Sequence, residues 1–207
     1  MNPSTHNVPG SKPSGDQLTA LVVQARDGNR LAFEQLIDRF QGEIHRMIYY
    51  RISARMDTED LTQDVFIRAY RNISRIREPG KFRSWLFTIA VNRVNDYLRK
   101  KRLRSIFRSS DEDTEIHPAA NDIQDPPEAL EHVLKEDFWR HVGRIAKKLS
   151  KMEREVFMLR FFDNLNINEI ARILKKSEST VKTHLYRALA KFKKEKGLRQ
   201  FLQEDLT

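Results

Sequence analysis

The stretch Leu165–Lys191, LNINEIARILKKSESTVKTHLYRALAK, decides the fold of the second half of this chain. Asn166 and Ser177 are both residue types that cap helix N-termini, and each precedes a run with apolar residues at helical spacing. The pattern predicts a short helix from Ile167 to about Lys175, then a turn and a longer helix. The residues expected where these two helices cross are Ile170, Ala171, Leu174, Val181 and Leu185. The stretch therefore predicts a helix-turn-helix.

The outer face of the second helix carries short hydrogen-bonding side chains and long basic ones. Such side chains near a helix N-terminus suit base edges and phosphates in a DNA major groove. The side chains expected to contact DNA are Ser179, Thr180, Lys182, Thr183, Tyr186 and Arg187, with Lys191, Lys193, Lys194 and Lys196 adding charge toward phosphates. The alternative is an ordinary helical hairpin with a solvated basic face, and Lys176 favours it, because many such turns have a small residue there.

The composition of the whole chain agrees with a polyanionic partner. The 207 residues include 38 Lys and Arg against 29 Asp and Glu, a net charge of +9. This excess favours nucleic acid first and an anionic membrane second. Because there is no cysteine, disulfide scaffolds, thiol nucleophiles and Cys-based metal sites are excluded, and a cytoplasmic location is expected. No apolar run approaches the roughly 20 residues that cross a bilayer.

Charge is distributed unevenly and predicts two all-helical domains. Nine basic residues lie between Lys81 and Arg108, opposed only by Asp96, whereas 111–128 holds seven acidic residues and no basic one. The acidic stretch also holds three prolines, which is typical of a flexible linker. The expected organisation is a disordered tail over 1–15, a first domain over 16–104, a linker over 105–128, a second domain over 129–200 and a tail over 201–207.

Local signals place the expected helices. Asp27-Gly28-Asn29 supplies a stop and a new start, and Glu78-Pro79-Gly80 breaks the chain again. In the second domain, Ser150 and Glu153 fit a capping box, so a helix should start there with Val156, Phe157 and 159–161 on or near its buried side. No segment alternates with period two, so the fold class is all-α, with no sheet expected.

Three motifs together resemble a known family. The run Asp60-Leu-Thr-Gln-Asp-Val-Phe66 resembles region 2.2 of extracytoplasmic-function (ECF) sigma factors of the sigma-70 superfamily. The run from Phe82 to Asn92, followed by Asp96-Tyr-Leu-Arg99, resembles regions 2.3 and 2.4, and 149–188 is similar to domain four. The motifs stand in the family's order and cover about Gln17 to Lys196. The resemblance implies a transcription initiation factor with sigma domains two and four.

The resemblance also implies a contact with core RNA polymerase on the region 2.2 helix, through Asp60, Gln63, Asp64 and Phe66. The spacing i, i+3, i+4 places the three polar residues on one helix face. A solvated acidic face is one alternative. Another alternative is a divalent-metal site on Asp57, Asp60 and Asp64, which predicts a magnesium-dependent enzyme. No second carboxylate helix or phosphate-binding loop accompanies these three residues.

For the promoter −10 element, the resemblance implies that Asn92 lines a pocket for a flipped base and that the loop from Ile76 to Phe82 closes over that base. An amide suits a base edge because it both donates and accepts. Trp85, Phe82, Phe87 and Tyr97 could stack on bases, but their helical spacing assigns most of them to the core. The −10 contacts expected by position are Ile76, Phe82, Trp85, Asn92, Arg93, Asn95, Asp96 and Arg99, with 100–102 binding phosphates.

In domain four, the family's −35 readers fall on the outer-face residues named above, with His184 as a phosphate neighbour. The acidic linker would thread the RNA exit path of the polymerase; a solvated tether explains its charge equally well. Core RNA polymerase, promoter DNA and an anti-sigma factor are the implied partners of a chain that is monomeric when free. No small-molecule substrate, cofactor, metal or catalytic residue is expected. A dimeric DNA-binding regulator remains the alternative and predicts palindromic sites.

Overall fold

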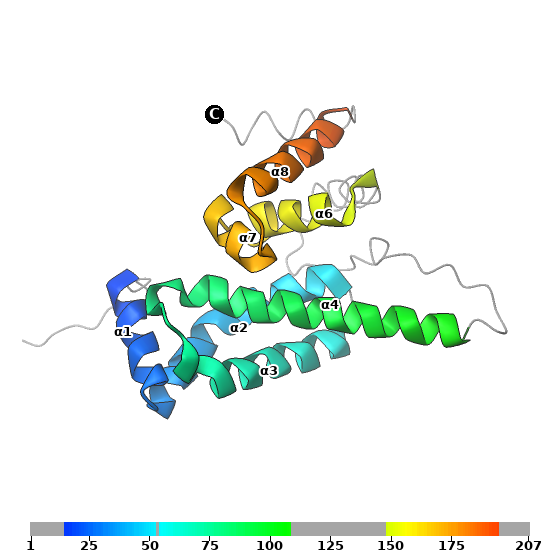
Figure 1. The fold of residues 1–207 in the computed structure, drawn as a ribbon. Coiled ribbons are helices and arrows are strands. Elements are labelled where there is room, and N and C mark those ends of the chain that lie inside the picture. Colours follow the sequence, from blue (N-terminus) through cyan, green and yellow to red (C-terminus); the bar gives the residue numbers. More distant parts are fainter. Residues whose placement is uncertain (1–14, 53, 109–147, 195–207) are drawn as a thin grey trace, which may run out of the picture.

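The computed structural model describes residues 15–52, 54–108 and 148–194, and every regular element in these ranges is helical. The first unit contains α1 (Gly15–Arg26), α2 (Arg30–Ile52), α3 (Arg55–Asn72) and α4 (Phe82–Arg108), with short 3-10 turns at Ile73–Arg75 and Pro79–Lys81. The second contains α6 (Lys151–Phe157), a π-helical turn (Met158–Phe162), α7 (Ile167–Leu174) and α8 (Glu178–Lys193). Figure 1 shows α6, α7 and α8 stacked on one side of the first unit.

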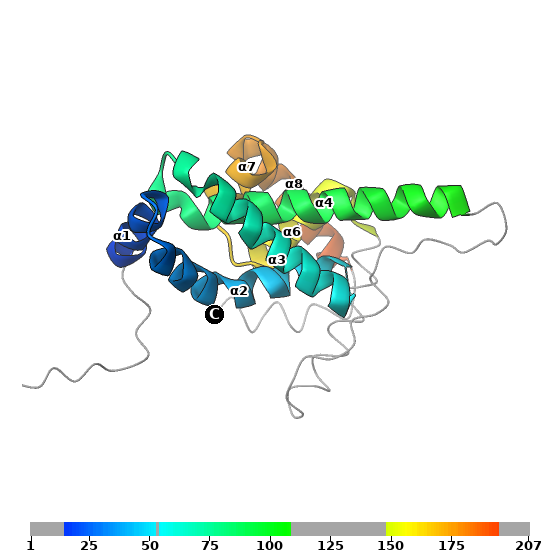
Figure 2. The same ribbon diagram turned by 90° about the horizontal axis from the view of Figure 1, so that it is seen from below.

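The helix boundaries follow the local signals. Gly28 adopts a φ of +99°, which side chains disfavour, and ends the first helical segment. Asn29 then accepts a hydrogen bond from the backbone N–H of Ala32 (3.1 Å) at the start of α2. The predicted stop and start are therefore confirmed. Helix α4 continues to Arg108, four residues past the expected domain boundary, and Figures 1 and 2 show its C-terminal half extending beyond the other helices.

The core of the first unit is formed by one apolar face from each helix. Fully buried members include Val22, Leu36, Ile48, Val65 and Leu86. Phe66 and Phe82 also lie in this core, at 6% and 1% exposure. Neither ring has surface to offer a partner, so the assignments of Phe66 to polymerase contact and of Phe82 to DNA contact are corrected: both side chains hold the helices together.

The second unit is a compact three-helix arrangement. Val156 and Leu159 are fully buried, as expected, and so is Leu165, but Phe161 is 51% exposed. The π-helical turn accounts for this difference, because its wider turn shifts the following side chains around the axis relative to an α-helix. The structure does not describe residues 109–147. The expected linker after Arg108 and the part of the second domain before Lys148 therefore have no structural description.

The apolar core does not stop between the two units. A single cluster of contacting buried side chains includes Phe87 of α4 together with Leu165, Ile170 and Ile173 of the second unit. Helices α4 and α7 are in direct contact, and α7 lies beside α4 in both views (Figures 1 and 2). The sequence predicted two domains but gave no sign of this packing between them.

Candidate nucleic-acid interface

The helix-turn-helix is built as predicted, and its caps are complete. Asn166 accepts from the backbone N–H of Glu169 (2.9 Å), and the Glu169 carboxylate accepts from the N–H of Asn166 (2.8 Å). Ser177 accepts from the N–H of Thr180 at the start of α8 (3.2 Å). Ser150 and Glu153 form a second reciprocal capping box at α6. Each cap satisfies N–H groups that a helix start leaves without partners.

The turn between α7 and α8 depends on Lys175 rather than on Lys176. Lys175 adopts left-handed backbone angles (φ 53°, ψ 46°), and Lys176 donates its N–H to the carbonyl of Ala171 (2.9 Å). This pair of features is a Schellman ending, in which glycine is the usual left-handed residue. The strained position is thus one residue before Lys176, which the sequence pattern had marked as unusual for such a turn.

The outer face of α8 is accessible. Tyr186 is 67% exposed, and Ser179, Lys182, Thr183 and Arg187 are also exposed. Thr180 and His184 are half-buried. All of the exposed residues belong to the set expected to contact DNA, and their hydroxyl, ammonium and guanidinium groups can donate to bases or phosphates.

Lys191 does not belong to that face. Its ammonium group donates to Glu153 Oε2 (2.6 Å) and to the carbonyl of Lys148 (3.1 Å), which ties α8 to the start of α6. The hydrogen bond from Lys191 lowers the pKa of the Glu153 carboxyl. We therefore correct the expectation for Lys191, which is structural, while Lys193 and Lys194 remain exposed.

A second polar surface follows α4. Trp85, Thr88, Asn92, Asp96 and Arg99 succeed one another at intervals of three or four residues, so they lie along one strip of the helix. Asn92 and Arg99 are exposed; Asn95, beside the strip, is half-buried. Asp96 pairs with Arg99 (3.1 Å). The fifteen residues from 85 to 99 span about 21 Å, which is roughly the length of six stacked nucleotides.

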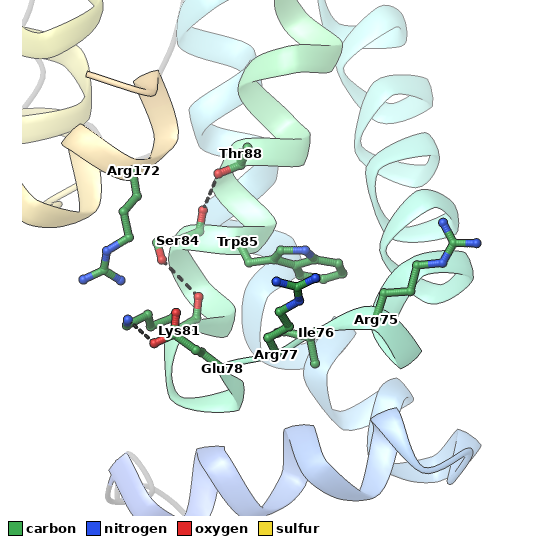
Figure 3. Close-up of a pocket in the computed structure, with 9 residues that line it drawn as sticks. All are labelled: Arg75, Ile76, Arg77, Glu78, Lys81, Ser84, Trp85, Thr88 and Arg172. Carbon is green, nitrogen blue, oxygen red and sulfur yellow. Dashed lines mark hydrogen bonds and ion pairs between the residues drawn. The ribbon is translucent and has the colours of Figure 1, made fainter. Parts of the chain in front are cut away.

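A pocket of about 310 Å³ opens at the N-terminal end of this strip (Figure 3). Trp85 and Ile76 form its apolar walls, and Ser84 and Thr88 contribute hydroxyl groups. Those hydroxyls donate to the carbonyls of Lys81 (3.0 Å) and Ser84 (2.8 Å). The remaining lining residues are charged: Arg75, Arg77, Glu78, Lys81 and Arg172. An aromatic wall near four cations and one carboxylate suits a base with its phosphates.

The other expected −10 residues are distributed differently. Arg93 forms an ion pair with Asp64 of α3, which also accepts from Arg68 (3.1 Å). Tyr97 donates its hydroxyl proton to Asp57 of α3 (2.6 Å), so it braces α4 on α3. Burial and then this hydrogen bond raise the pKa of Tyr97 to about 12.

The acidic face of α3 is divided by these pairings. Asp60 and Gln63 are exposed, whereas Asp64 is engaged with two arginines. Asp57 is turned to Tyr97, so the three carboxylates of the alternative metal site do not converge. Among the described residues, no group of three or more His, Asp or Glu side chains is placed to hold a metal ion.

Comparison with known proteins identifies the family of this chain. The sigma-70 region 2 model matches residues 36–104, and the sigma-70 region 4 model matches residues 142–192. The ECF RNA polymerase sigma factor BldN of Streptomyces coelicolor is 32% identical over 89% of this chain and 67% of its own length. The sigma-E factor of Escherichia coli is 30% identical over 84% of this chain and 92% of its own.

The chain is an ECF sigma factor. It is therefore a promoter-specific transcription initiation factor of RNA polymerase, as its motifs predicted. The fold agrees with solved structures: CnrH in complex with the cytosolic domain of CnrY has a TM-score of 0.62 at 24% identity, over 92% of this chain and 99% of that one. RpoE of Bartonella quintana, in complex with the anti-sigma factor NepR, has a TM-score of 0.57 at 23% identity, over 78% and 94%.

The structure of this ECF sigma factor adds polar residues to the site that the sequence motifs did not mark. Arg75 lines the pocket although no motif marked it, and Arg172 reaches the same pocket from α7 (Figure 3). Arg77 and Lys81, which also line it, fall within the loop from Ile76 to Phe82 that the resemblance places over the base. Arg51 was also missed, although one signal was available. It continues the buried stripe Ile44, Met47, Ile48 at helical spacing, where a charged side chain needs a buried partner. In the part of the chain that is described, no helix is long and apolar enough to span a membrane.

Arg51 finds its partners in the second unit. It donates to Asp163 Oδ2 (2.8 Å) and Glu155 Oε1 (3.2 Å), and its side chain is 6% exposed. Burial opposes the charge on Arg51, but Glu155 and Asp163 outweigh burial and raise its pKa. Burial likewise raises the pKa of Asp163, and Arg51 offsets part of that rise. Each ion therefore depends on the other to remain charged away from water.

Arg83 of α4 makes a second connection. Its guanidinium donates to Glu43 (Nε–Oε1 3.0 Å) and to the carbonyl of Asp163 (2.6 Å), and it lies 3.9 Å from Glu169 at the start of α7. Arg83 thus joins α2, α4 and the loop before α7.

Proposed function

We propose that the outer face of α8 reads the −35 element in the major groove. The exposed α8 residues Ser179, Lys182, Thr183, Tyr186 and Arg187 support this proposal, because a capped, accessible helix N-terminus with donors at this spacing is suited to a groove. Lys182 and Arg187 are the candidates for guanine contacts, each worth about 1–3 kcal/mol of discrimination. Thr180 and His184, which are half-buried at the edge of this face, are the candidates for phosphate contacts.

The −10 element is assigned to the pocket and the strip along α4. A base leaving the duplex loses a few kcal/mol of pairing and stacking, and Trp85 and Ile76 provide an apolar wall against which that loss is recovered. Asn92, one turn beyond Thr88, offers an exposed amide to a base edge. Asn95, Asp96 and Arg99 continue the track toward the basic end of the helix.

Core RNA polymerase is assigned to the exposed positions of α3. Asp60 and Gln63 are accessible on one face and have the spacing of a helix contact site. Asp64 sits beside them, and its pairing with Arg93 gives it a positioning role between this face and the α4 strip. In this scheme, the protein acts in the cytoplasm by binding alone, with no covalent chemistry, cofactor or metal.

An anti-sigma factor is proposed as a regulatory partner. The similar structures of CnrH and of RpoE were each solved with a partner, the cytosolic domain of CnrY and the anti-sigma factor NepR. An anti-sigma protein would have to cover the polymerase face, the promoter surfaces, or both.

The observation that carries the proposal is the placement of two separate polar surfaces, α8 and the α4 strip, on one sigma-family chain. The test is genome-wide run-off transcription with purified core polymerase, followed by mapping of the transcript starts. We expect starts preceded by two spaced elements that depend on this protein. Transcripts that are the same without it, or a failure to bind core polymerase, would refute the assignment.

A further inference from the structure

We propose that the contacts of Arg51 and Arg83 with the second unit form an autoinhibitory latch, which holds the free chain closed with α7 over the −10 pocket. The latch is defined as Arg51 with Asp163 and Glu155, and Arg83 with Asp163 and Glu169. The inference concerns regulation of the pocket and so depends on the proposed assignment of that pocket to the −10 element.

Geometry shows that the closed form cannot engage a promoter at both elements. The names of the −10 and −35 elements place them about 25 base pairs apart, which is about 85 Å of duplex. Here α7 packs directly on α4, and only three residues separate the end of α7 from the start of α8. Since the 16 residues of α8 extend only about 24 Å, no part of α8 can reach the distance required. The two units must separate before both elements are bound.

The closed form also obstructs the −10 pocket itself. Arg172 of α7 forms part of the pocket lining, opposite Trp85 and Ser84 (Figure 3). Its guanidinium is hydrogen-bonded to Asn168 on the same helix, so α7 itself holds it in place. A nucleotide entering from this side would meet the α7 helix, and separation of the units removes that wall.

The chemistry of the latch makes it reversible. Leu165, Ile170 and Ile173 share one buried apolar cluster with the first unit, and the packing of α7 on α4 favours closure, as burial of apolar surface does generally. The ionic part contributes register more than free energy, because burial of Arg51 and Asp163 costs much of what their attraction returns. When the units part, water solvates both ions, so opening leaves no charge stranded in the core.

Neutralising one member of the latch, unlike opening it, leaves an unpaired charge buried in the closed form. In Arg51→Met, Asp163 and Glu155 face each other without the cation between them, and the closed form becomes unfavourable while the open form is unaffected. We expect the ratio of closed to open molecules to fall at least about tenfold, which corresponds to 1.4 kcal/mol. Asp163→Asn leaves Arg51 with Glu155 and should give a smaller shift in the same direction.

The test is a distance measurement in the full chain. Because the protein has no cysteine, spin labels can be placed at Gln24→Cys on α1 and Lys151→Cys on α6, both exposed positions away from the proposed sites. Double electron–electron resonance should give one narrow, short distance for the free wild type. It should give broad, longer distances for Arg51→Met, and also for the wild type bound to core polymerase. Arg30→Met is the matched control, since Arg30 lies exposed on the same helix and pairs only with Glu34 of that helix among the described residues (3.0 Å).

Several outcomes would overturn the latch. These are a broad distribution for the free wild type, an unchanged narrow one for Arg51→Met, or a short distance that persists in the complex with core polymerase. Thermal unfolding followed by circular dichroism separates opening from misfolding, and Glu155→Gln, at a half-buried position, provides a milder variant. If the latch fails while promoter-dependent transcription persists, the proposed function stands and only the autoinhibition is refuted.

Discussion

At the scale of single residues, Lys175 shows where the fold stores strain. Its left-handed backbone ends α7 where glycine is the favoured residue. A residue with a side chain in that backbone region costs roughly 1–2 kcal/mol of stability. A glycine relieves this cost, but part of the gain is lost because glycine gives the unfolded chain more conformational freedom.

We therefore expect Lys175→Gly to raise the free energy of unfolding of the second unit by up to about 1 kcal/mol. Urea titration followed by circular dichroism measures the change. Lys176→Gly, at the neighbouring position, is the control and should not stabilise the protein. If both variants stabilise equally, left-handed strain at Lys175 is not the cause.

Tyr97 gives a second prediction, which depends on pH. Its pKa is raised in the folded protein, so its contribution to stability is complete below pH 10 and is lost as pH rises through about 12. Tyr97→Phe removes the hydrogen bond to Asp57 and should destabilise the first unit by roughly 1 kcal/mol at neutral pH. The difference between the two proteins should shrink above pH 10. In a spectrophotometric titration, the variant should lack the tyrosine that ionises last; a late-titrating tyrosine that remains would contradict this.

At the scale of elements, α7 shows how caps define a short helix. Eight residues make a helix too short to be stable alone, so its ends and its packing decide whether it forms. The capping box of Asn166 and Glu169 satisfies donors at one end, and the Schellman ending satisfies carbonyls at the other.

Removing the cap should weaken this element. Asn166→Ala loses the side-chain acceptor for Glu169 N–H, and we expect the second unit to be destabilised by about 1 kcal/mol. Amide hydrogen exchange should show the loss first in α7 and α8, with the first unit unaffected. Lys176→Ala, at an exposed position just past the other end of α7, is the control, because this change leaves the capping box and the backbone hydrogen bonds of the Schellman ending in place. Equal effects of the two changes would argue against capping.

The helix boundaries and the exposed face of α8 are the parts of the site that could be predicted from sequence. Helix positions and caps depend on residues three or four apart, which is why the boundaries at Ser150, Asn166 and Ser177 and the exposed face of α8 were predicted from sequence. Phe66 and Phe82 were misassigned because a motif match does not distinguish a residue that packs in the core from one that contacts a partner. Their burial appears only when several helices meet.

At the scale of the whole molecule, the proposed surfaces are separable. Lys182 and Arg187 lie on α8, whereas Asp60 and Gln63 lie on α3 of the other unit. Because these positions share no partner among the residues that the structure describes, changes at one surface should not alter the other.

Lys182→Ala or Arg187→Ala should reduce promoter-dependent transcription about tenfold or more while core polymerase is bound normally. Asp60→Ala or Gln63→Ala should weaken core binding without changing which promoters are selected. Fluorescence polarisation with core enzyme and run-off transcription measure the two activities. Lys151→Ala, an exposed lysine on α6, is the control for loss of charge. Variants that lost both activities in parallel would contradict the separation.

The sequence by itself determined the helical class, the caps, the helix-turn-helix and the family, because each of these is encoded in short-range spacing or in ordered motifs. Only the tertiary structure decided that α7 covers α4, that Arg172 lines the pocket and that Arg51 is buried against Asp163. The physical reason is distance along the chain. Arg51 and its two acceptors are 104 and 112 residues apart, and no local periodicity links positions so far separated. Arg51 and its acceptors meet only because each unit has apolar surface beyond its own core, and these two surfaces are buried against each other.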